Sequence, residues 1–317
     1  MNTQLIKRRA LAATCIIVLL AVLVGIVSWA GSYYPAYNKD SKNHLERLRV
    51  IDIYENPLGE AIPQTVVYGL IKDHFANAEK TPKLLFIGYD GAYALLPALN
   101  YGDPDSAISA VAAEGGLYLT YCGGATKGAQ DTSTAPGWAA TFTGVWATEN
   151  GVYSNLYTLN KKTESIIYQL GKQGKKTSFS TIWGPHFTRT YKNEVAAAKA
   201  NNYPIEYILN EDDDASVDSM LAKINAGYDA IFGILEYTDR NGHGTGFSID
   251  NPKYVNGYLE GEKQALKLFD AVKARETYEQ EDWLIIITSD HGGYGTSHGS
   301  PSPMETYIFL ATNKKLP

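Results

Sequence analysis

Short, continuous apolar runs alternate with stretches of helical spacing, and this alternation constrains the fold more than any other feature of the sequence. A continuous apolar run is expected of a strand that is buried on both faces. Such runs cover residues 83–90, 116–121, 176–183, 229–237, 282–290 and 306–312. Helical spacing covers residues 63–75, 163–173, 216–227 and 254–274. The order predicts an α/β fold with a mostly parallel central sheet and helices on both faces.

The N-terminal segment predicts that most of the chain is exported. Lys7, Arg8 and Arg9 precede residues 10–30, a run without any charged side chain. About 20 apolar residues form a helix that crosses the roughly 30 Å core of a bilayer. Basic residues on the N-terminal side place that end in the cytoplasm and the rest of the chain outside. A cleaved signal peptide is the alternative, in which case the body is secreted.

These features divide the chain into a short series of parts. They are a cytoplasmic N-terminus (1–9), a transmembrane anchor or signal peptide (10–30), a tether (31–62) and one large folded domain (63–317). The net charge of −6 provides no basic surface for a nucleic-acid polymer, so binding of such a polymer is not expected. We therefore expect a single-pass, membrane-anchored protein with an extracytoplasmic domain.

Acidic and imidazole side chains collect where several predicted strands end. Ligands of parallel sheets bind beyond the carboxyl ends of the strands. Taken singly, an aspartate at a strand end is more often a turn residue or a helix cap. Together these side chains are enough for two sites of three ligands, and imidazole with carboxylate favours zinc over magnesium or calcium, with manganese and iron as alternatives. The residues are Asp90, Asp239, His243, Asp290, His291 and His298.

A hydroxyl group near the start of a predicted helix offers a nucleophile for such a centre. Thr134 precedes Ala135-Pro136-Gly137 and an apolar segment. The first turn of a helix presents free N–H groups and the positive end of the helix dipole, which favour phosphate. As a single feature, a helix cap at Ser133 or Thr134 is the more common explanation.

Taken in order, these motifs resemble those of the alkaline phosphatase superfamily, and most closely its type I phosphodiesterase and nucleotide pyrophosphatase branch. The segment STAPGWAATFTGVWATENGV is similar to the nucleophile segment of that branch. The resemblance covers roughly residues 80–317. It depends on Asp90-Gly91, Thr-x-Pro at 134–136, Asp239 with His243, Asp290-His291-Gly292 and His298.

The resemblance implies an alkaline phosphatase-like catalytic domain over residues 63–317 with two divalent metal ions, zinc being the favoured identity. The ligands implied for one ion are Asp239, His243 and His298. The ligands implied for the other ion are Asp90, Asp290 and His291, and this ion also contacts Thr134.

The resemblance also implies the chemistry. Thr134 is expected to attack phosphorus and form a phosphothreonine, while Asn155 holds a phosphate oxygen. A free threonine hydroxyl is a poor nucleophile, and coordination to a metal ion lowers its pKa. The implied activity is hydrolysis of small phosphate diesters or pyrophosphates.

Two departures from the branch leave the substrate open. Ala135 stands where many members have an aromatic residue that stacks on a base, which weakens the expectation of a nucleotide substrate. The short spacing in DHGGYGTSHG is also similar to that of the glycosylphosphatidylinositol ethanolamine-phosphate transferases. A phosphoethanolamine-type transferase or a phosphomonoesterase is therefore the alternative, and a metal-stabilised surface binding protein without activity is a third hypothesis.

Overall fold

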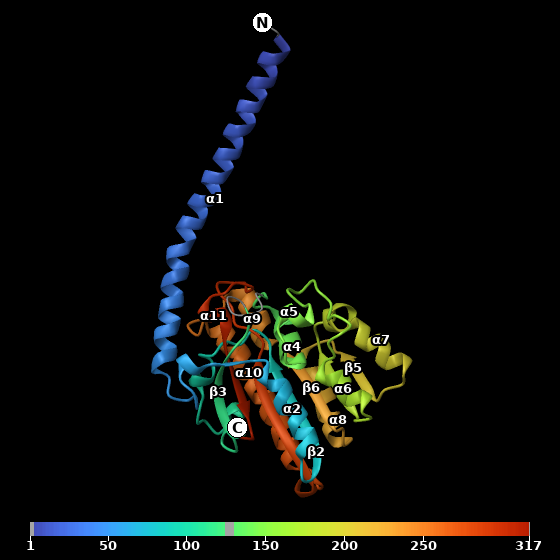
Figure 1. The fold of residues 1–317 in the computed structure, drawn as a ribbon. Helices are drawn as coiled ribbons and strands as arrows, with labels where there is room; N and C mark the ends of the chain where they lie inside the picture. The colour runs from blue at the N-terminus through green and yellow to red at the C-terminus, as the bar shows by residue number, and fades with distance from the viewer. Residues whose placement is uncertain (1–2, 124–129, 317) are drawn as a thin grey trace. The chain divides into compact units, whose positions relative to one another are not determined.

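The computed structural model of the protein describes residues 3–123 and 130–316, and it describes side chains from residue 12 onward except for residues 26–35. The chain divides into two compact units, Met1–Arg47 and Leu48–Pro317. Helix α1 (Thr3–Val50) accounts for the first unit, so the tether predicted over residues 31–62 is helical as far as Val50 (Figure 1). An ion pair between Lys42 and Glu46, at 3.7 Å and one helical turn apart, favours this continuation.

The membrane span predicted over residues 10–30 lies partly outside the described side chains. Within the described part of the chain, no helix combines the length and the apolar character needed to cross a membrane.

The described residues of the second unit form a sheet of eight strands in the order β1-β3-β8-β7-β2-β6-β4-β5. Only β8 runs antiparallel to its neighbours, β3 and β7, among the pairs formed by these strands. The predicted mostly parallel sheet is thereby confirmed. The strands are β1 (Ile62–Pro63), β2 (Thr81–Tyr89), β3 (Gly116–Tyr121), β4 (Thr177–Thr181), β5 (Ile205–Leu209), β6 (Ala230–Leu235), β7 (Glu281–Ser289) and β8 (Tyr307–Thr312).

Helices pack on both faces of this sheet, as the alternating order predicts (Figure 1). On one face α10 packs against α3, α8 and α9, and on the other α2, α4 and α6 pack together. The helices are α2 (Val66–Asn77), α3 (Ala107–Ala112), α4 (Thr134–Thr143), α5 (Ala147–Asn150), α6 (Ile166–Lys172), α7 (Lys192–Ala200), α8 (Asp213–Asn225), α9 (Tyr237–Thr245), α10 (Pro252–Lys273) and α11 (Pro303–Thr306).

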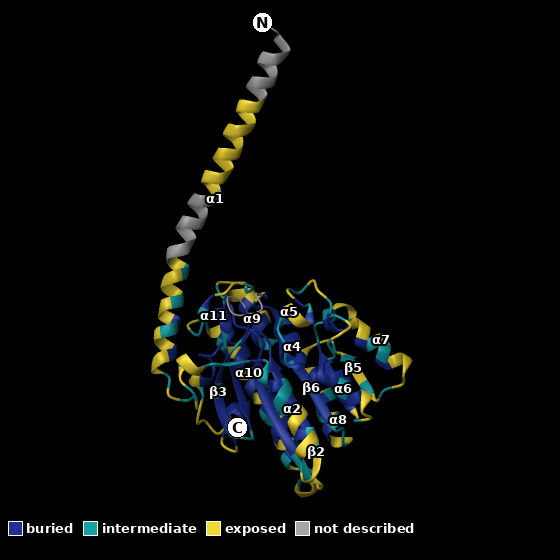
Figure 2. Ribbon diagram, viewed as in Figure 1, coloured by how far each residue is buried: buried dark blue, intermediate teal, exposed yellow. Residues whose placement is uncertain are grey.

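The central strand β2 divides its side chains between two apolar cores. Leu85 and Ile87 point into the core that contains α10, while Leu84 and Phe86 point into the core that contains α4. Side chains alternate between the faces of a strand, so a continuous apolar run is what a strand covered on both sides requires. Figure 2 shows the resulting buried strands in dark blue between the helices.

Two strands and several helices were not predicted from the sequence, and α9 is the one of these helices that carries predicted site residues. Strand β1 has only two residues, and the edge strand β5 has a partly exposed pattern without a continuous apolar run. Helix α9 covers residues 237–245, which the sequence analysis treated as the end of a strand and the loop after it. This helix contains Asn241, Gly242 and Gly244, which are poor helix formers.

Candidate metal and phosphate site

Strand register brings the site residues to one edge of the sheet. Tyr89, the last residue of β2, lies opposite Leu235 of β6 and Ser289 of β7. The residues that follow these three are Asp90, Glu236 and Asp290. Because the strands are parallel, these three acidic residues lie next to one another just beyond the C-terminal ends of the strands.

Asp90, Asp290 and His291 form a cluster that we call the buried group. His291 Nε2 lies 3.5 Å from Asp90 Oδ1 and 3.4 Å from Asp290 Oδ2. One possible ligand atom from each residue lies within 4.8 Å of the others. The three side chains are almost completely excluded from solvent. This is the set of ligands predicted for one metal ion.

Asp239, His243 and His298 form a second cluster, which we call the open group. Asp239 and His243 lie four residues apart on helix α9, which places them on the same face. His243 Nε2 is 3.4 Å from Asp239 Oδ2, and His298 Nε2 is 3.9 Å from Asp239 Oδ1. The side chain of His243 is 44% exposed, in contrast to every member of the buried group.

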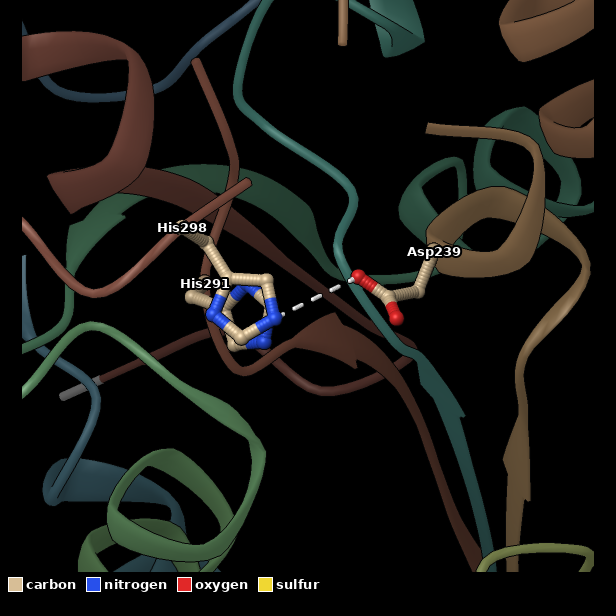
Figure 3. A group of neighbouring side chains, drawn as sticks. All are labelled: Asp239, His291 and His298. Atoms are coloured by element: carbon tan, nitrogen blue, oxygen red, sulfur yellow. Dashed lines mark ion pairs between the residues drawn. The ribbon is translucent and has the colours of Figure 1, made fainter. Parts of the chain in front are cut away.

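The two groups are contiguous, and His291 lies between them. Its ring centroid is 4.0 Å from that of His298. Figure 3 shows both imidazoles beside Asp239, with the ion pair to His298 dashed. The tightest cluster around Asp239 therefore contains His298 and His291, whose possible ligand atoms lie within 4.8 Å, and it does not include His243. From the sequence, His243 was predicted in place of His291.

Hydrogen bonds orient all three imidazoles in the same way. His291 Nδ1 lies 2.7 Å from the Gly292 carbonyl oxygen. His243 Nδ1 lies 2.9 Å from the Thr296 carbonyl oxygen, and His298 Nδ1 lies 3.2 Å from the Thr132 carbonyl oxygen. A carbonyl oxygen only accepts, so Nδ1 carries the proton and Nε2 of the neutral ring keeps a free lone pair. Metal-binding histidines are held by second-shell partners of this kind.

Unpartnered carboxylate oxygens show that the groups fit divalent cations. Asp90 Oδ1, Asp239 Oδ1 and Asp290 Oδ2 are buried without a hydrogen-bond partner among the described residues. An unpaired buried carboxylate is costly, and buried charges in proteins are paired or bind metals. Two clusters of carboxylate oxygens and imidazole nitrogens suit zinc, which takes such ligands and leaves a position open in catalytic sites.

The electrostatics of the cation-free residues agree with this interpretation. Burial, together with repulsion between neighbouring carboxylates, raises the pKa of Asp90 and Asp290 well above the ordinary range. Burial and the charge of Glu236 raise the pKa of Asp239 to about 7. Burial and the nearby His243 lower the pKa of His298 to about 4, so its ring is neutral at physiological pH. These shifts show that the buried and open groups together contain several carboxyl groups without a nearby positive charge, which a bound cation would supply.

Thr134 lies at the first position of α4, next to the buried group. Its Oγ1 is 3.5 Å from His291 Nε2. Ser133 occupies the cap position, but its hydroxyl makes no capping hydrogen bond and has no partner among the described residues. Ser133 therefore does not cap α4 through its side chain, which was the simpler explanation for a hydroxyl residue at this position.

Asn155 is close to Thr134 in space. Its Oδ1 accepts a hydrogen bond from the Ala135 N–H at 2.8 Å. Its own carbonyl oxygen accepts from Arg189 Nη1 at 3.1 Å. The loop that carries Asn155 is thus fixed against the first turn of α4, and all the residues proposed from the sequence meet at one end of the sheet.

Glycines let these segments approach one another. Gly91 has a φ of +69°, and a Cβ there would lie 2.6 Å from Asp239 Oδ1. Gly295 and Gly299 have positive φ angles, which glycine adopts readily where the loop between His291 and His298 bends sharply. Gly292 has a different reason, since a Cβ there would lie 2.0 Å from the Met304 carbonyl oxygen.

Two residues near the ligands were not predicted. Glu236 follows β6 and has an Oε1 that is buried without a partner among the described residues. Burial and the charge of Asp90 raise its pKa to about 8. Trp138 donates its indole N–H to Asp90 Oδ2 at 3.0 Å. Glu236 could have been found from the sequence, because it directly follows a strand. The sequence contains no signal for the contact between Trp138 and Asp90.

A comparison with protein-family models identifies the family. The model of the type I phosphodiesterases and nucleotide pyrophosphatases matches residues 131–312, which is more than half of the chain. The chain belongs to this family. The match contains Thr134, Asn155 and every ligand of the open group, while Asp90 lies before it. The resemblance predicted from the motifs is therefore confirmed.

Solved structures agree at the level of the fold. Murine ectonucleotide pyrophosphatase/phosphodiesterase 5, an inactive form in complex with AMP, is 17% identical with a TM-score of 0.50 over 67% of this chain. A 2-O GAG sulfatase is 13% identical with a TM-score of 0.52 over 74% of this chain. This chain spans 57% and 64% of the lengths of those two proteins. Among curated proteins, none matches this chain in sequence.

Proposed function

We propose that this protein is a phosphodiesterase that uses two divalent cations, most simply zinc, to cleave phosphate diesters or pyrophosphates through a phosphothreonine on Thr134. The observation that carries this proposal is the position of Thr134 Oγ1, which lies 3.5 Å from His291 Nε2 at the start of α4. Bound cations would supply Lewis acidity that lowers the pKa of the attacking hydroxyl and of water. That there are two cations, and that they are zinc, is part of this proposal.

The chain's own residues support a two-step displacement. Thr134 Oγ1 loses its proton and forms a bond to phosphorus, the bond to the leaving oxygen breaks, and the leaving group takes up a proton. Water then attacks phosphorus, the bond between phosphorus and Thr134 Oγ1 breaks, Oγ1 regains a proton and the phosphorylated product, a monoester where the substrate is a diester, is released. The first turn of α4 favours the negative charge of the phosphoryl group through its dipole. Asn155 Oδ1 accepts from the Ala135 N–H, so Nδ2 is the part of this amide that would donate to a phosphate oxygen.

We propose that the cations divide between the two groups as the family resemblance implies. Asp90, Asp290 and His291 would hold the cation that contacts Thr134. Asp239, His243 and His298 would hold the other, where solvent can arrive because His243 is half exposed. His243 is supported by its orientation, since Nε2 faces Asp239 while Nδ1 donates to the backbone.

Replacement of the nucleophile tests the mechanism. We expect Thr134→Ala to abolish hydrolysis of an aryl phosphodiester, and Thr134→Ser to retain a measurable part of it, because only the serine supplies a hydroxyl. Chelation should stop the wild-type enzyme and added zinc should restore it. Full activity of Thr134→Ala would exclude the phosphothreonine. Faster cleavage of an aryl monoester, or transfer to an alcohol acceptor, would favour the monoesterase or the transferase instead.

We also propose that residues 10–30 anchor the protein in a membrane, with the catalytic domain on the extracytoplasmic side. The support is the charge-free run that follows Lys7, Arg8 and Arg9. Protease added to intact cells should degrade the domain, and alkaline extraction should leave the full chain with the membranes. Recovery of the full-length chain in the soluble fraction would exclude the anchor.

A further inference from the structure

Trp138 contacts the buried group through a single, well-defined hydrogen bond. Its Nε1–H donates to Asp90 Oδ2 at 3.0 Å. The other oxygen, Asp90 Oδ1, lies 3.5 Å from His291 Nε2 and has no hydrogen-bond partner among the described residues. One oxygen of this carboxylate is therefore fixed by the indole, and the other remains available.

The surroundings of Trp138 fix the indole in place. The side chain is fully buried. Its ring stacks on Phe142 with centroids 5.8 Å apart and meets Phe86 edge to face at 5.9 Å. On β2, a Cβ at Gly88 would lie 2.4 Å from the indole Cη2. The glycine on β2 thus leaves room for the indole ring at a position two residues before Asp90.

A purely structural role for this hydrogen bond does not account for the whole arrangement. A buried indole N–H needs an acceptor, and a neutral carboxamide oxygen would serve it equally well. The chain instead places a carboxylate there, with a second carboxylate, Asp290, beside the same imidazole. Burying two negative charges together is unfavourable unless a cation compensates them.

We propose that Trp138 is a positioning residue for cation binding. Its indole N–H holds Oδ2 of Asp90, so that Oδ1 faces the point shared with Asp290 and His291. The inference depends on the metal-binding part of the proposed function. Second-shell hydrogen bonds of this kind typically change metal affinity by about 10- to 100-fold.

Removal of the N–H without removal of the ring tests this role. In the full chain, Trp138→Phe should weaken binding at one of the two zinc sites by about 10- to 100-fold, with the other unchanged. Zinc affinities are measured on the metal-free protein by competition with a chromophoric chelator. Should Trp138→Phe fail to fold, replacement of Trp138 by 3-benzothienylalanine substitutes sulfur for the N–H in a ring of the same shape, and we expect the same loss.

Phe142→Leu provides the matched control. It alters the same aromatic cluster but leaves the indole donor intact, so it should lower the melting temperature of the metal-free protein and leave both zinc affinities unchanged. In an Asp90→Asn background, Trp138→Phe should cause no further loss of affinity. Wild-type affinity in Trp138→Phe, or an equal loss in Phe142→Leu, would overturn the proposal.

The readout separates this inference from the proposed activity. Zinc affinity is measured without substrate, so a wild-type protein that binds two zinc ions but cleaves no diester would remove the proposed activity and leave the role of Trp138 intact. Conversely, an active diesterase whose zinc affinity does not respond to Trp138→Phe would remove the positioning role alone.

Discussion

The buried group and the open group are built from the same kinds of side chain but differ in their support and in their access to solvent. The buried group follows β2 and β7, whose register places Asp90 and Asp290 side by side. The open group depends on helix α9 and on a glycine-rich loop, and its His243 is half exposed. Sheet register therefore fixes the buried group, while the open group is more accessible to solvent.

This difference fits the two steps of the proposed displacement through a phosphothreonine. Thr134, the proposed nucleophile, is buried and its Oγ1 lies 3.5 Å from His291 Nε2 of the buried group, so the proposed attacking oxygen is shielded from solvent. The second step needs water, which reaches the open group more easily. The predictions below test this division, beginning with the largest effect.

The first prediction concerns the buried group. Asp90→Asn should lower turnover of an aryl phosphodiester by about three orders of magnitude or more, on the scale seen when one member of a catalytic unit is removed. The same change should raise the melting temperature of the metal-free protein, because a neutral amide avoids the free-energy cost of protonating a buried carboxyl group whose pKa is raised by folding. Each 1 kcal/mol gained corresponds to roughly 2–4 °C in a domain of this size. Substantial residual activity, or a lower melting temperature of the metal-free variant, would contradict the role given to this group.

The second prediction concerns the open group. His243→Ala should reduce activity at limiting zinc by at least the roughly 10- to 100-fold that the loss of an outer-shell partner of a metal site costs, because His243 is proposed as a direct ligand. Excess zinc should restore part of this loss, because the remaining ligands still form a site. His298→Ala should be more damaging, since His298 belongs to the tighter cluster around Asp239. Equal effects of the two changes would show that His243 is as strong a ligand as His298, and no effect of His243→Ala would exclude it from the site.

The third prediction concerns pH and is the smallest. Folding raises the pKa of Asp239 to about 7 and that of Glu236 to about 8, and it raises those of Asp90 and Asp290. The folded state then holds more protons than the unfolded state near neutral pH, so the free energy of unfolding falls as pH rises. The lowered pKa of His298, about 4, acts in the opposite direction, but this effect is complete above the ordinary pKa of histidine, 6.5.

The metal-free protein should therefore lose a few degrees of melting temperature between about pH 6.5 and pH 8. With saturating zinc the trend should weaken or reverse, because protons compete with the metal for the same ligands. Melting curves at the two pH values, with chelator and with zinc, measure both effects. A metal-free protein that becomes more stable over this range would show that the carboxylates are compensated in another way.

Much of the fold and of the site could be predicted from the sequence. The apolar run at 116–121 coincides with β3, and the runs at 83–90 and 282–290 overlap β2 and β7 closely enough to place Asp90 and Asp290 at strand ends. Local composition decides these features, since a strand covered on both faces needs an unbroken apolar run. The position of Thr134 at the start of a helix follows from the same local signals.

Helix α9 could not be predicted in this way. Its sequence disfavours a helix, and it forms where it packs on α10 and where the Phe247 ring lies over Gly242. The helix then places Asp239 and His243 on one face, with Nε2 and Oδ2 3.4 Å apart. Tertiary packing outweighed local propensity at this element.

The sequence by itself determined which residue types follow each strand, and with them the chemistry of the centre: carboxylates, imidazoles and one threonine hydroxyl. Only the tertiary structure decided how they meet. The pairing of His298 with Asp239, the hydrogen bonds that orient His243 and His298, and the contact between Trp138 and Asp90 all join residues that are 48 or more positions apart. No local pattern encodes such contacts, because strand register and packing between layers determine them after the chain has folded.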